Sequence, residues 1–478
     1  MMKDLPLVAV IGAGSSGIAV CKNLKQHGIP FECFEASDRI GGMWVFKNKI
    51  AFNGKSSAYR TLHINTSRRQ MEYLDFPMPD DYPDFPSHEQ VARYFDSYVD
   101  HFGFRDHIRF NTTVTHCERL QDGTWEVTLD NGETRLFDAL VVANGHHWDP
   151  RWPNPPFPGR FDGIQMHSHY YVDPSEPHDF RGKNVVIVGL GNSAMDIACD
   201  LGKGVANRVF LSGRTGVYVV PKYWLGKLPF DFMLRHPSAP PGLLERAIWR
   251  MPDWVYNKVA YPVTTLFLNL LVGHPTKYGL PQPKGWFGQQ HPTVSAEIHI
   301  RLGSGDVIPK PNIKELQGDK VLFEDGSMEP VDAIIYCTGY NIRFPFFDDT
   351  LIAVEDNDIA LYQRIMDPRY SNLFFVGLVQ QLCAMMPIAD EQSKWIVEYL
   401  RGHYHPPHPD VMRERMLDEH ERTKRQFISS PRHTIQINCQ KYTFDLLEDL
   451  HEGRRRAQLA GNSLPILPRA AKQEAQPA

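Results

Sequence analysis

Apolar and polar positions at the start of the chain alternate in a regular way. Residues 7–11 form a short apolar run, residues 12–17 read GAGSSG, and a helical period follows. This order predicts a strand, a GxGxxG turn and a helix. In such a turn Gly12 allows the tight bend, Gly14 lets a pyrophosphate approach the backbone, and Gly17 packs the helix on the strand.

A second apolar run closes this unit and ends in an acid, Glu35. A carboxylate at that place accepts the two ribose hydroxyls of an adenosine that carries no 2′-phosphate, as in FAD. The pattern therefore predicts a strand–helix–strand unit that binds FAD. Its expected contact residues are Gly12, Gly14, Ser15, Ser16, Gly17 and Glu35.

Residues 184–214 repeat the pattern. An apolar run at 184–188 leads into GLGNSA at 189–194, which includes Gly189 and Gly191, and the next apolar run ends in Ser212-Gly213-Arg214 rather than in an acid. An acid would repel the 2′-phosphate of NADP, whereas Ser212 and Arg214 can bind it by hydrogen bond and charge. The second unit therefore predicts an NADPH site, with NADPH preferred over NADH.

Both units are followed by a hairpin and a closing apolar strand, which ends at Gly145 in the first case and at Gly339 in the second. We interpret this as an internal duplication. It predicts an α/β fold with two Rossmann-like dinucleotide-binding domains, the NADP domain being inserted into the FAD domain. The expected limits are 1–178 for the first FAD segment, 179–330 for the NADP domain with a helical insert at about 217–300, 331–452 for the second FAD segment, and 453–478 for a disordered tail.

Composition excludes some function classes. The chain has 478 residues, of which 42% are hydrophobic, and its net charge of −5 gives no sign of nucleic-acid binding. The N-terminal residues run at once into a strand, which leaves no room for a signal peptide, and no apolar run reaches the length of a membrane span. The longest apolar stretch, 261–273, is expected to be a buried helix, with a membrane-contacting surface as the alternative. We expect a cytoplasmic protein without a transmembrane anchor, and a homodimer is left open.

Cysteine and histidine usage points away from metals and disulfides. The seven cysteines are widely spaced and include no CxxC pair, so we expect reduced, mostly buried thiols. His403, His405 and His408 look like a metal-binding tract, but they lie among prolines without an acidic or thiol partner. The sequence therefore predicts no metal.

Several short motifs occur in one order along the chain. They are GAGSSG at 12–17, GGMW at 41–44, NTS at 65–67, Phe161-x-Gly163-xxx-His167-xxx-Tyr171, GLGNSAMD at 189–196 and CTGY at 337–340. In this combination the chain resembles the class B flavin-containing monooxygenases from residue 8 to about residue 402. Tyr171 favours the branch that oxygenates nitrogen and sulfur, of the N,N-dimethylaniline monooxygenase type. The polar C-terminal end differs from the membrane anchor of the family's eukaryotic members, which favours a soluble, bacterial protein.

The resemblance implies FAD and NADPH as cofactors, with O2 and a small-molecule nucleophile as substrates. Reduced FAD would form a C4a-hydroperoxide with O2 and pass one oxygen atom to an amine nitrogen or a sulfide sulfur. Asn65 would be the catalytic residue that holds the flavin adduct together with retained NADP+. Further implied residues contact FAD (Met43, Trp44, Thr66, Gln380), contact the NADP pyrophosphate (Asn192, Ser193, Ala194, Asp196) or link the domains (Phe161, Gly163, His167, Tyr171).

Three alternatives stay open. A Baeyer–Villiger oxygenase would use the same cofactors on ketones, although its motif usually carries Trp where this chain has Tyr171. A flavin disulfide reductase would need a redox-active cysteine pair, and none has a suitable spacing. A catalytically silent nucleotide-binding sensor would bind the cofactors without oxidising NADPH. The sequence does not identify the substrate.

Overall fold

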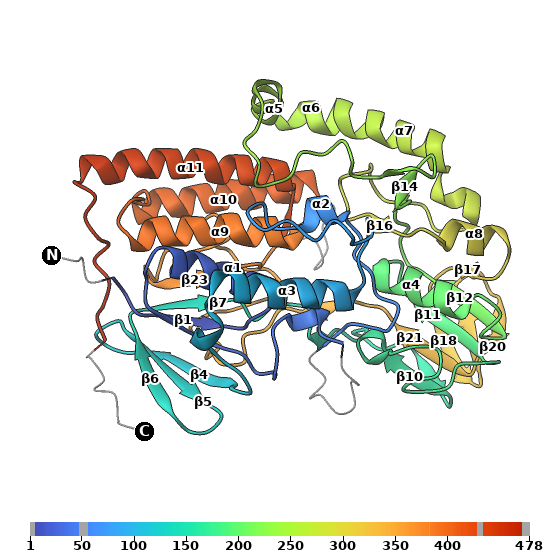
Figure 1. Cartoon of the computed structure of the whole chain (residues 1–478). Helices are drawn as coiled ribbons and strands as arrows, with labels where there is room; N and C mark the ends of the chain where they lie inside the picture. The colour runs from blue at the N-terminus through green and yellow to red at the C-terminus, as the bar shows by residue number, and fades with distance from the viewer. Residues whose placement is uncertain (1–4, 47–55, 382, 428–433, 471–478) are drawn as a thin grey trace.

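Two parallel sheets form the centres of two α/β units in the computed structural model, which describes residues 5–46, 56–381, 383–427 and 434–470 (Figure 1). The first sheet has the order β23-β7-β1-β2-β3. Helix α1 packs on one of its faces and a small antiparallel sheet on the other, which is why its central strands read as continuous apolar runs. The strands are β1 (Val8–Ile11), β2 (Phe31–Phe34), β3 (Ile108–Arg109), β7 (Ala139–Val142) and β23 (Leu373–Phe375), and the helices on this unit include α1 (Ser15–Gln26) and α3 (His88–Phe102).

The second parallel sheet has the order β10-β21-β11-β12-β17. It consists of β10 (Ile164–His167), β11 (Asn184–Val188), β12 (Arg208–Ser212), β17 (Ile308–Lys310) and β21 (Ala333–Tyr336), with helix α4 (Asn192–Leu201) after its glycine turn. The sheet reaches beyond the expected limits 179–330 at both ends, because the chain enters the unit as β10 and leaves it as β21, and these two strands pair in parallel.

Each parallel sheet carries an antiparallel sheet, so the duplicated plan extends to the hairpins. On the first unit these strands are β4 (Val114–Arg119), β5 (Trp125–Leu129) and β6 (Thr134–Phe137). On the second they are β18 (Ile313–Gly318), β19 (Lys320–Phe323) and β20 (Met328–Pro330), and β9 (Gly159–Phe161) joins this sheet by pairing in parallel with β18. The predicted α/β class with two units of one design is confirmed.

The insert between β12 and β17 forms a cap of its own, held by the pairing of β13 (Val219–Val220) with β16 (Thr293–Val294). Helices α5 (Leu243–Trp249), α6 (Asp253–Val255) and α7 (Tyr261–Val272) lie together at the top of Figure 1. The prediction of a buried helix at 261–273 is wrong, because α7 buries only Thr265 and Leu268 and leaves most of its apolar side chains exposed. Within the described residues, no helix has both the length and the apolar character needed to cross a membrane.

Three C-terminal helices stack over the first unit (Figure 1). They are α9 (Met385–Leu400), α10 (Pro409–Gln426) and α11 (Cys439–Leu459). Helix α11 continues into the range expected to be a disordered tail, because Asp449 on its inner face accepts hydrogen bonds from Tyr362, Trp395 and Tyr404. Gly453, one turn later, lies against the ring of Tyr404.

Cys383 and Cys439 form a disulfide, which corrects the expectation that all seven cysteines are reduced. The two residues are 56 positions apart in the sequence. They meet because β24 (Gln380–Gln381) pairs with β25 (Gln436–Ile437), and each cysteine follows one of these strands by two positions. The other five cysteines are free thiols, and four of them are buried as expected.

Candidate functional site

A cavity of about 810 Å³ is lined by the glycine turns of both units. Of the predicted site residues, those that line it are Gly12, Gly14, Ser15, Ser16, Glu35, Met43, Trp44, Asn65, Thr66, Gly189, Gly191, Asn192, Ser193, Ala194 and Gln380. The fold therefore brings the two predicted nucleotide turns, which lie far apart in the sequence, to one space.

The first turn has the shape that a pyrophosphate needs. Gly12 has φ +99°, and a Cβ there would lie 2.7 Å from the carbonyl oxygen of Ala143. A Cβ at Gly17 would lie 1.8 Å from the carbonyl oxygen of Gly12, so only glycine lets α1 begin this close to the strand. A Cβ on Gly42 would lie 3.2 Å from the Cα of Gly14, so two backbone segments meet at the cavity wall. The turn leaves its backbone open to a ligand, and it fits FAD.

Glu35 follows the last residue of β2 and is buried. Its Oε2 accepts a hydrogen bond from the N–H of Ala13 and its Oε1 accepts one from the N–H of Ser37, both at 2.8 Å. These bonds fix the carboxylate beside the first turn. Each oxygen keeps a further lone pair, so the group can also accept from ribose hydroxyls, as the FAD prediction requires.

Asn65 and Thr66 lie on a short segment that the insert holds in place. The Nζ of Lys222 donates to the carbonyl oxygen of Ile64 at 3.0 Å, and Oδ2 of Asp231 accepts from the N–H of Ser67 at 2.7 Å. Burial lowers the pKa of Lys222 and raises the pKa of Asp231. The sequence analysis missed both residues, because nothing local distinguishes them from the other charged residues of the insert.

The turn before β24 closes the other side of the first turn. Gly377 has φ +78°, and a Cβ there would lie 2.1 Å from Oγ of Ser16. The N–H of Gln380 donates to the carbonyl oxygen of Ile435 at 2.8 Å, which fixes the backbone of β24 while the Gln380 residue lines the cavity. A C-terminal segment thus completes a site whose first residues lie at the N-terminus.

The second turn is built like the first and is held by the end of the insert. Gly189 has φ +121°, and a Cβ there would lie 2.5 Å from the carbonyl oxygen of Cys337. Oδ1 of Asn192 accepts from the N–H of Val294 at 2.9 Å, and Oγ1 of Thr293 donates to the carbonyl oxygen of Leu190 at 2.7 Å. This turn fits the pyrophosphate of NADP for the same reason that the first fits FAD.

Three residues predicted for NADP lie outside the cavity lining. The hydroxyl of Ser212 is buried and donates to the carbonyl oxygen of Pro311 at 2.8 Å, so it is not presented to a 2′-phosphate. Asp196 accepts a short hydrogen bond from the hydroxyl of Tyr59, and burial raises its pKa to about 6. Arg214 is exposed beyond the end of β12, and its guanidinium has no hydrogen bond or ion pair with any residue that the structure describes. Of the three, only Arg214 is free to meet a phosphate.

The predicted linking motif runs through the edge strand of the second sheet. Phe161 ends β9, and a Cβ on Gly163 would lie 2.4 Å from the carbonyl oxygen of Asp332. His167 is fully buried at the end of β10, where its Nδ1 accepts from the N–H of His169 at 3.0 Å. Tyr171 is also fully buried and packs edge-on against Tyr59, and burial raises the pKa of its phenol. These four residues support the sheet and do not line the cavity, although Ser168, between His167 and Tyr171, does.

His146 lines the cavity and was not singled out from the sequence. It follows the strand β7, at the carboxyl edge of the first sheet. Burial and the neighbouring imidazole of His147 lower the pKa of His146 well below its usual value. The side chain is therefore neutral at pH 7 and can both donate and accept a hydrogen bond.

Comparison with known proteins agrees with this geometry. A family model described as flavin-binding monooxygenase-like matches residues 6–453. The chain is 36% identical to flavin-containing monooxygenase 3 of Rattus norvegicus over 409 residues, which cover 83% of this chain and 74% of that protein. It is 34% identical to dimethylaniline monooxygenase (N-oxide-forming) 2 of Macaca mulatta, with 92% of this chain and 81% of that protein covered.

Solved structures have the same architecture. S-allyl-L-cysteine S-oxygenase from Allium sativum superimposes with a TM-score of 0.68 and 25% identity over 94% of this chain and 88% of that chain. Cyclohexanone monooxygenase superimposes with the same TM-score of 0.68 but 19% identity, over 94% of this chain and 98% of that chain. The second likeness supports the fold alone.

Proposed function

Because the chain belongs to the flavin-binding monooxygenase-like family, we propose that the cavity lined by both glycine turns is where its cofactors and substrates meet. The protein is an FAD- and NADPH-dependent monooxygenase, which acts on a small molecule and O2. The observation that carries the proposal for the site is the convergence of the two turns on one cavity, one unit ending in Glu35 and the other in Arg214.

We assign FAD to the first turn and NADPH to the second. When bound, FAD accepts a hydride from NADPH and, once reduced, activates O2. Gly12, Gly14, Ser15 and Ser16 would hold the FAD pyrophosphate and Glu35 its ribose. Gly189, Gly191, Asn192, Ser193 and Ala194 would hold the NADP pyrophosphate.

Arg214 would bind the 2′-phosphate of NADPH. Its guanidinium is exposed, and no acid ends the second unit to repel a phosphate. An arginine can bind a phosphate with two parallel hydrogen bonds, which gives both charge and geometry to the contact.

Asn65 is the residue we propose for catalysis. Its amide offers a donor and an acceptor to the cavity, and the bonds from Lys222 to Ile64 and from Ser67 to Asp231 fix the backbone on either side of it. A positioned amide of this kind can hold the reacting groups in place without supplying an acid or a base. Apolar residues of the cavity lining, which include Trp44, Leu62, Ile64 and Met386, would limit the water that reaches the reaction.

The substrate we propose is a soft nucleophile, an amine nitrogen or a sulfide sulfur. Two relatives support it by their names, an N-oxide-forming dimethylaniline monooxygenase and an S-oxygenase of S-allyl-L-cysteine. Ketone oxidation is the second candidate, and the likeness to cyclohexanone monooxygenase carries it only at the level of fold.

The test is NADPH oxidation, oxygen uptake and product identity across a panel of tertiary amines, sulfides and cyclic ketones. The proposal expects N-oxide or sulfoxide in amounts close to the NADPH consumed. Lactone as the dominant product would favour the second candidate, and a yellow protein that oxidises no NADPH with any compound would contradict both. A homodimer and a cytoplasmic location stay predictions, which sedimentation and cell fractionation can check.

A further inference from the structure

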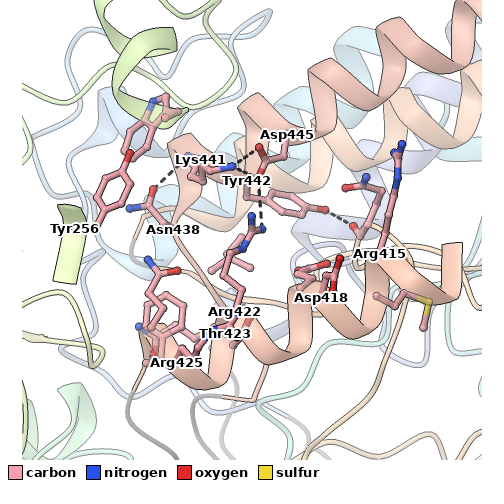
Figure 2. Close-up of a pocket in the computed structure, with 18 of the residues that line it drawn as sticks. Tyr256, Arg415, Asp418, Arg422, Thr423, Arg425, Asn438, Lys441, Tyr442 and Asp445 are labelled. Atoms are coloured by element: carbon pink, nitrogen blue, oxygen red, sulfur yellow. Dashed lines mark hydrogen bonds and ion pairs between the residues drawn. The ribbon is translucent and has the colours of Figure 1, made fainter. Parts of the chain in front are cut away.

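A second cavity of about 580 Å³ lies between α10, α11 and the insert. Figure 2 shows residues of α10, among them Arg422 and Arg425, across from Lys441 and Tyr442 of α11, with Tyr256 of the insert on a third side. The site proposed for the cofactors uses none of these residues.

The small sheet β24–β25 separates the two cavities. Gln380 and Gln381 of β24 line the cofactor cavity, while Gln436 and Ile437 of β25, their register partners, line the second one. The second cavity is therefore a space of its own, on the far side of a shared wall.

The ion pairs of this cavity leave it without a strong preference for a charged ligand. Lys441 pairs with Asp445 at 2.6 Å, and Arg422 approaches the same carboxylate at 3.7 Å. Glu419 pairs with Arg364 at 2.9 Å. The lining also carries Arg415, Arg425 and Asp418, so its four cations and three acids nearly balance, and an uncharged molecule fits it.

Gln436 is the feature that points to a ligand. The residue is 1% exposed, and neither Oε1 nor Nε2 has a hydrogen-bond partner within the described part of the chain. The indole N–H of Trp249, which also lines the cavity, has no partner within that part either. Buried polar groups are almost always paired in native proteins, so a donor and an acceptor side by side on one wall call for a partner that supplies both.

We propose that the second cavity is a binding site for a small, uncharged, planar molecule with an amide edge, such as a lactam or a nucleobase. The carboxamide of Gln436 would donate from Nε2 to the carbonyl of the molecule and accept its N–H at Oε1. The rings of Trp249 and Tyr256, whose planes are 10° apart, supply a flat aromatic wall, and the Trp249 indole N–H can donate to a second acceptor.

The experiment measures the binding of 2-pyridone to the purified, FAD-loaded protein by calorimetry and by NMR saturation transfer. N-methyl-2-pyridone is the matched ligand, because it keeps the ring and the carbonyl and lacks the N–H. We expect saturable binding of 2-pyridone and affinity about tenfold lower for the methylated compound, since one hydrogen bond is lost. The proposal also expects saturating NADP+ to leave the binding unchanged, because the cavities are separate.

Gln436→Leu tests the residue itself. The variant should bind 2-pyridone at least about tenfold more weakly and keep its flavin, since replacing unpaired polar atoms by apolar atoms of similar volume costs little stability. Gln440→Leu is the matched control, because Gln440 is a neighbouring residue with a buried, unpaired Nε2 that does not line the cavity. If Gln436→Leu folds poorly, the affinity of Trp249→Phe for 2-pyridone is measured instead, because this variant removes the indole N–H. The proposal would be overturned if millimolar 2-pyridone did not bind, if the methylated compound bound equally well, or if NADP+ displaced 2-pyridone. An unchanged affinity in both Gln436→Leu and Trp249→Phe would overturn it as well.

Discussion

The phenol of Tyr59, from the first unit, donates a hydrogen bond to the carboxylate of Asp196 on helix α4 of the second unit. Burial raises the pKa of Asp196 to about 6. The charged and titratable groups around it are Tyr59, Lys222, Asp200 and Glu297, of which only Lys222 favours the ionised form by its charge. A hydrogen bond between the two units thus ends on a carboxyl group whose ionisation is opposed by burial.

This contact predicts that Asp196→Asn changes how stability depends on pH. In the folded protein Asp196 stays protonated to a higher pH than in the unfolded chain, where its pKa is about 3.9. The stabilisation that comes from this bound proton is full below about pH 4 and is lost as the pH rises through about 6. The stability of the wild type relative to the variant should therefore fall by about 3 kcal/mol between pH 4 and 7. Urea unfolding at several pH values measures it.

Asp179→Asn is the control for this experiment, because Arg181 lowers the pKa of Asp179 to about 2, in the opposite direction. The difference between the wild type and this variant should stay flat above about pH 5. A flat difference for Asp196→Asn as well would show that folding does not raise the pKa of the Asp196 carboxyl.

Asn65→Ala should separate cofactor oxidation from oxygen transfer. The variant keeps both glycine turns, so FAD should stay bound and NADPH should still reduce it. Without the positioned amide, we expect product formation to fall by about 100-fold while hydrogen peroxide replaces the product. Peroxide and product measured per NADPH consumed give the answer, with Asn207→Ala, an exposed amide pairing with Asn184, as the control. Unchanged product per NADPH would remove Asn65 from the catalytic role.

Arg214→Ala should weaken the use of NADPH and leave the use of NADH nearly unchanged. The substitution removes a charge-assisted contact worth about 1.5–3 kcal/mol, which corresponds to roughly a tenfold to 100-fold loss in kcat/KM. Steady-state kinetics with both cofactors measure it. Arg181→Ala, which removes an exposed arginine paired with Asp179, controls for the loss of one surface charge. Equal losses with the two cofactors would contradict the phosphate contact.

Asp231→Ala should increase peroxide release although Asp231 lies in the insert. The substitution removes the acceptor of the Ser67 N–H and so loosens the segment that carries Asn65. The unpaired buried N–H should also cost about 1–3 kcal/mol of stability. Asp231→Asn keeps a carbonyl acceptor and should restore most of the product yield. A loss of stability with unchanged product per NADPH would show that the residue supports the fold alone.

The cysteines give a direct chemical prediction. Unfolded protein without reductant should show five reactive thiols, and seven after reduction. Closing a loop of 56 residues stabilises the fold by about 4 kcal/mol on chain-entropy grounds, so reduction should lower the melting temperature. Seven thiols without reductant would restore the expectation that all cysteines are reduced.

The sequence predicted what is encoded locally. The turn at Gly12, the acid Glu35 and the second turn at Gly189 follow from spacing within about 30 residues, and the structure places all three on one cavity. The direction of the Ser212 hydroxyl was beyond a local pattern, because it depends on a carbonyl that lies 99 residues later. The pairing of Cys383 with Cys439 likewise depends on β24 meeting β25.

The residues missed at the site were those that act across domains. Lys222 and Asp231 bind backbone groups that lie 158 and 164 positions earlier in the chain. No local sequence pattern in either segment indicates this contact. The exposure of α7 was predicted wrongly for a related reason. An apolar stretch indicates that a helix forms, but it does not show whether another part of the protein covers that helix.

The hydrogen bonds from the insert to Ile64 and Ser67 limit where chimeras of this enzyme and its relatives can be joined. An exchange of the whole range 217–300 would replace Lys222, Asp231 and Thr293 together with the cap, and would put the 64–67 segment and the second glycine turn at risk at once. Crossover points after Asp231 and before Thr293 would transplant α5, α6 and α7 and leave every one of these anchors native. The cap can then be varied as a separate module for access to the cavity, while the catalytic geometry is inherited unchanged from the host.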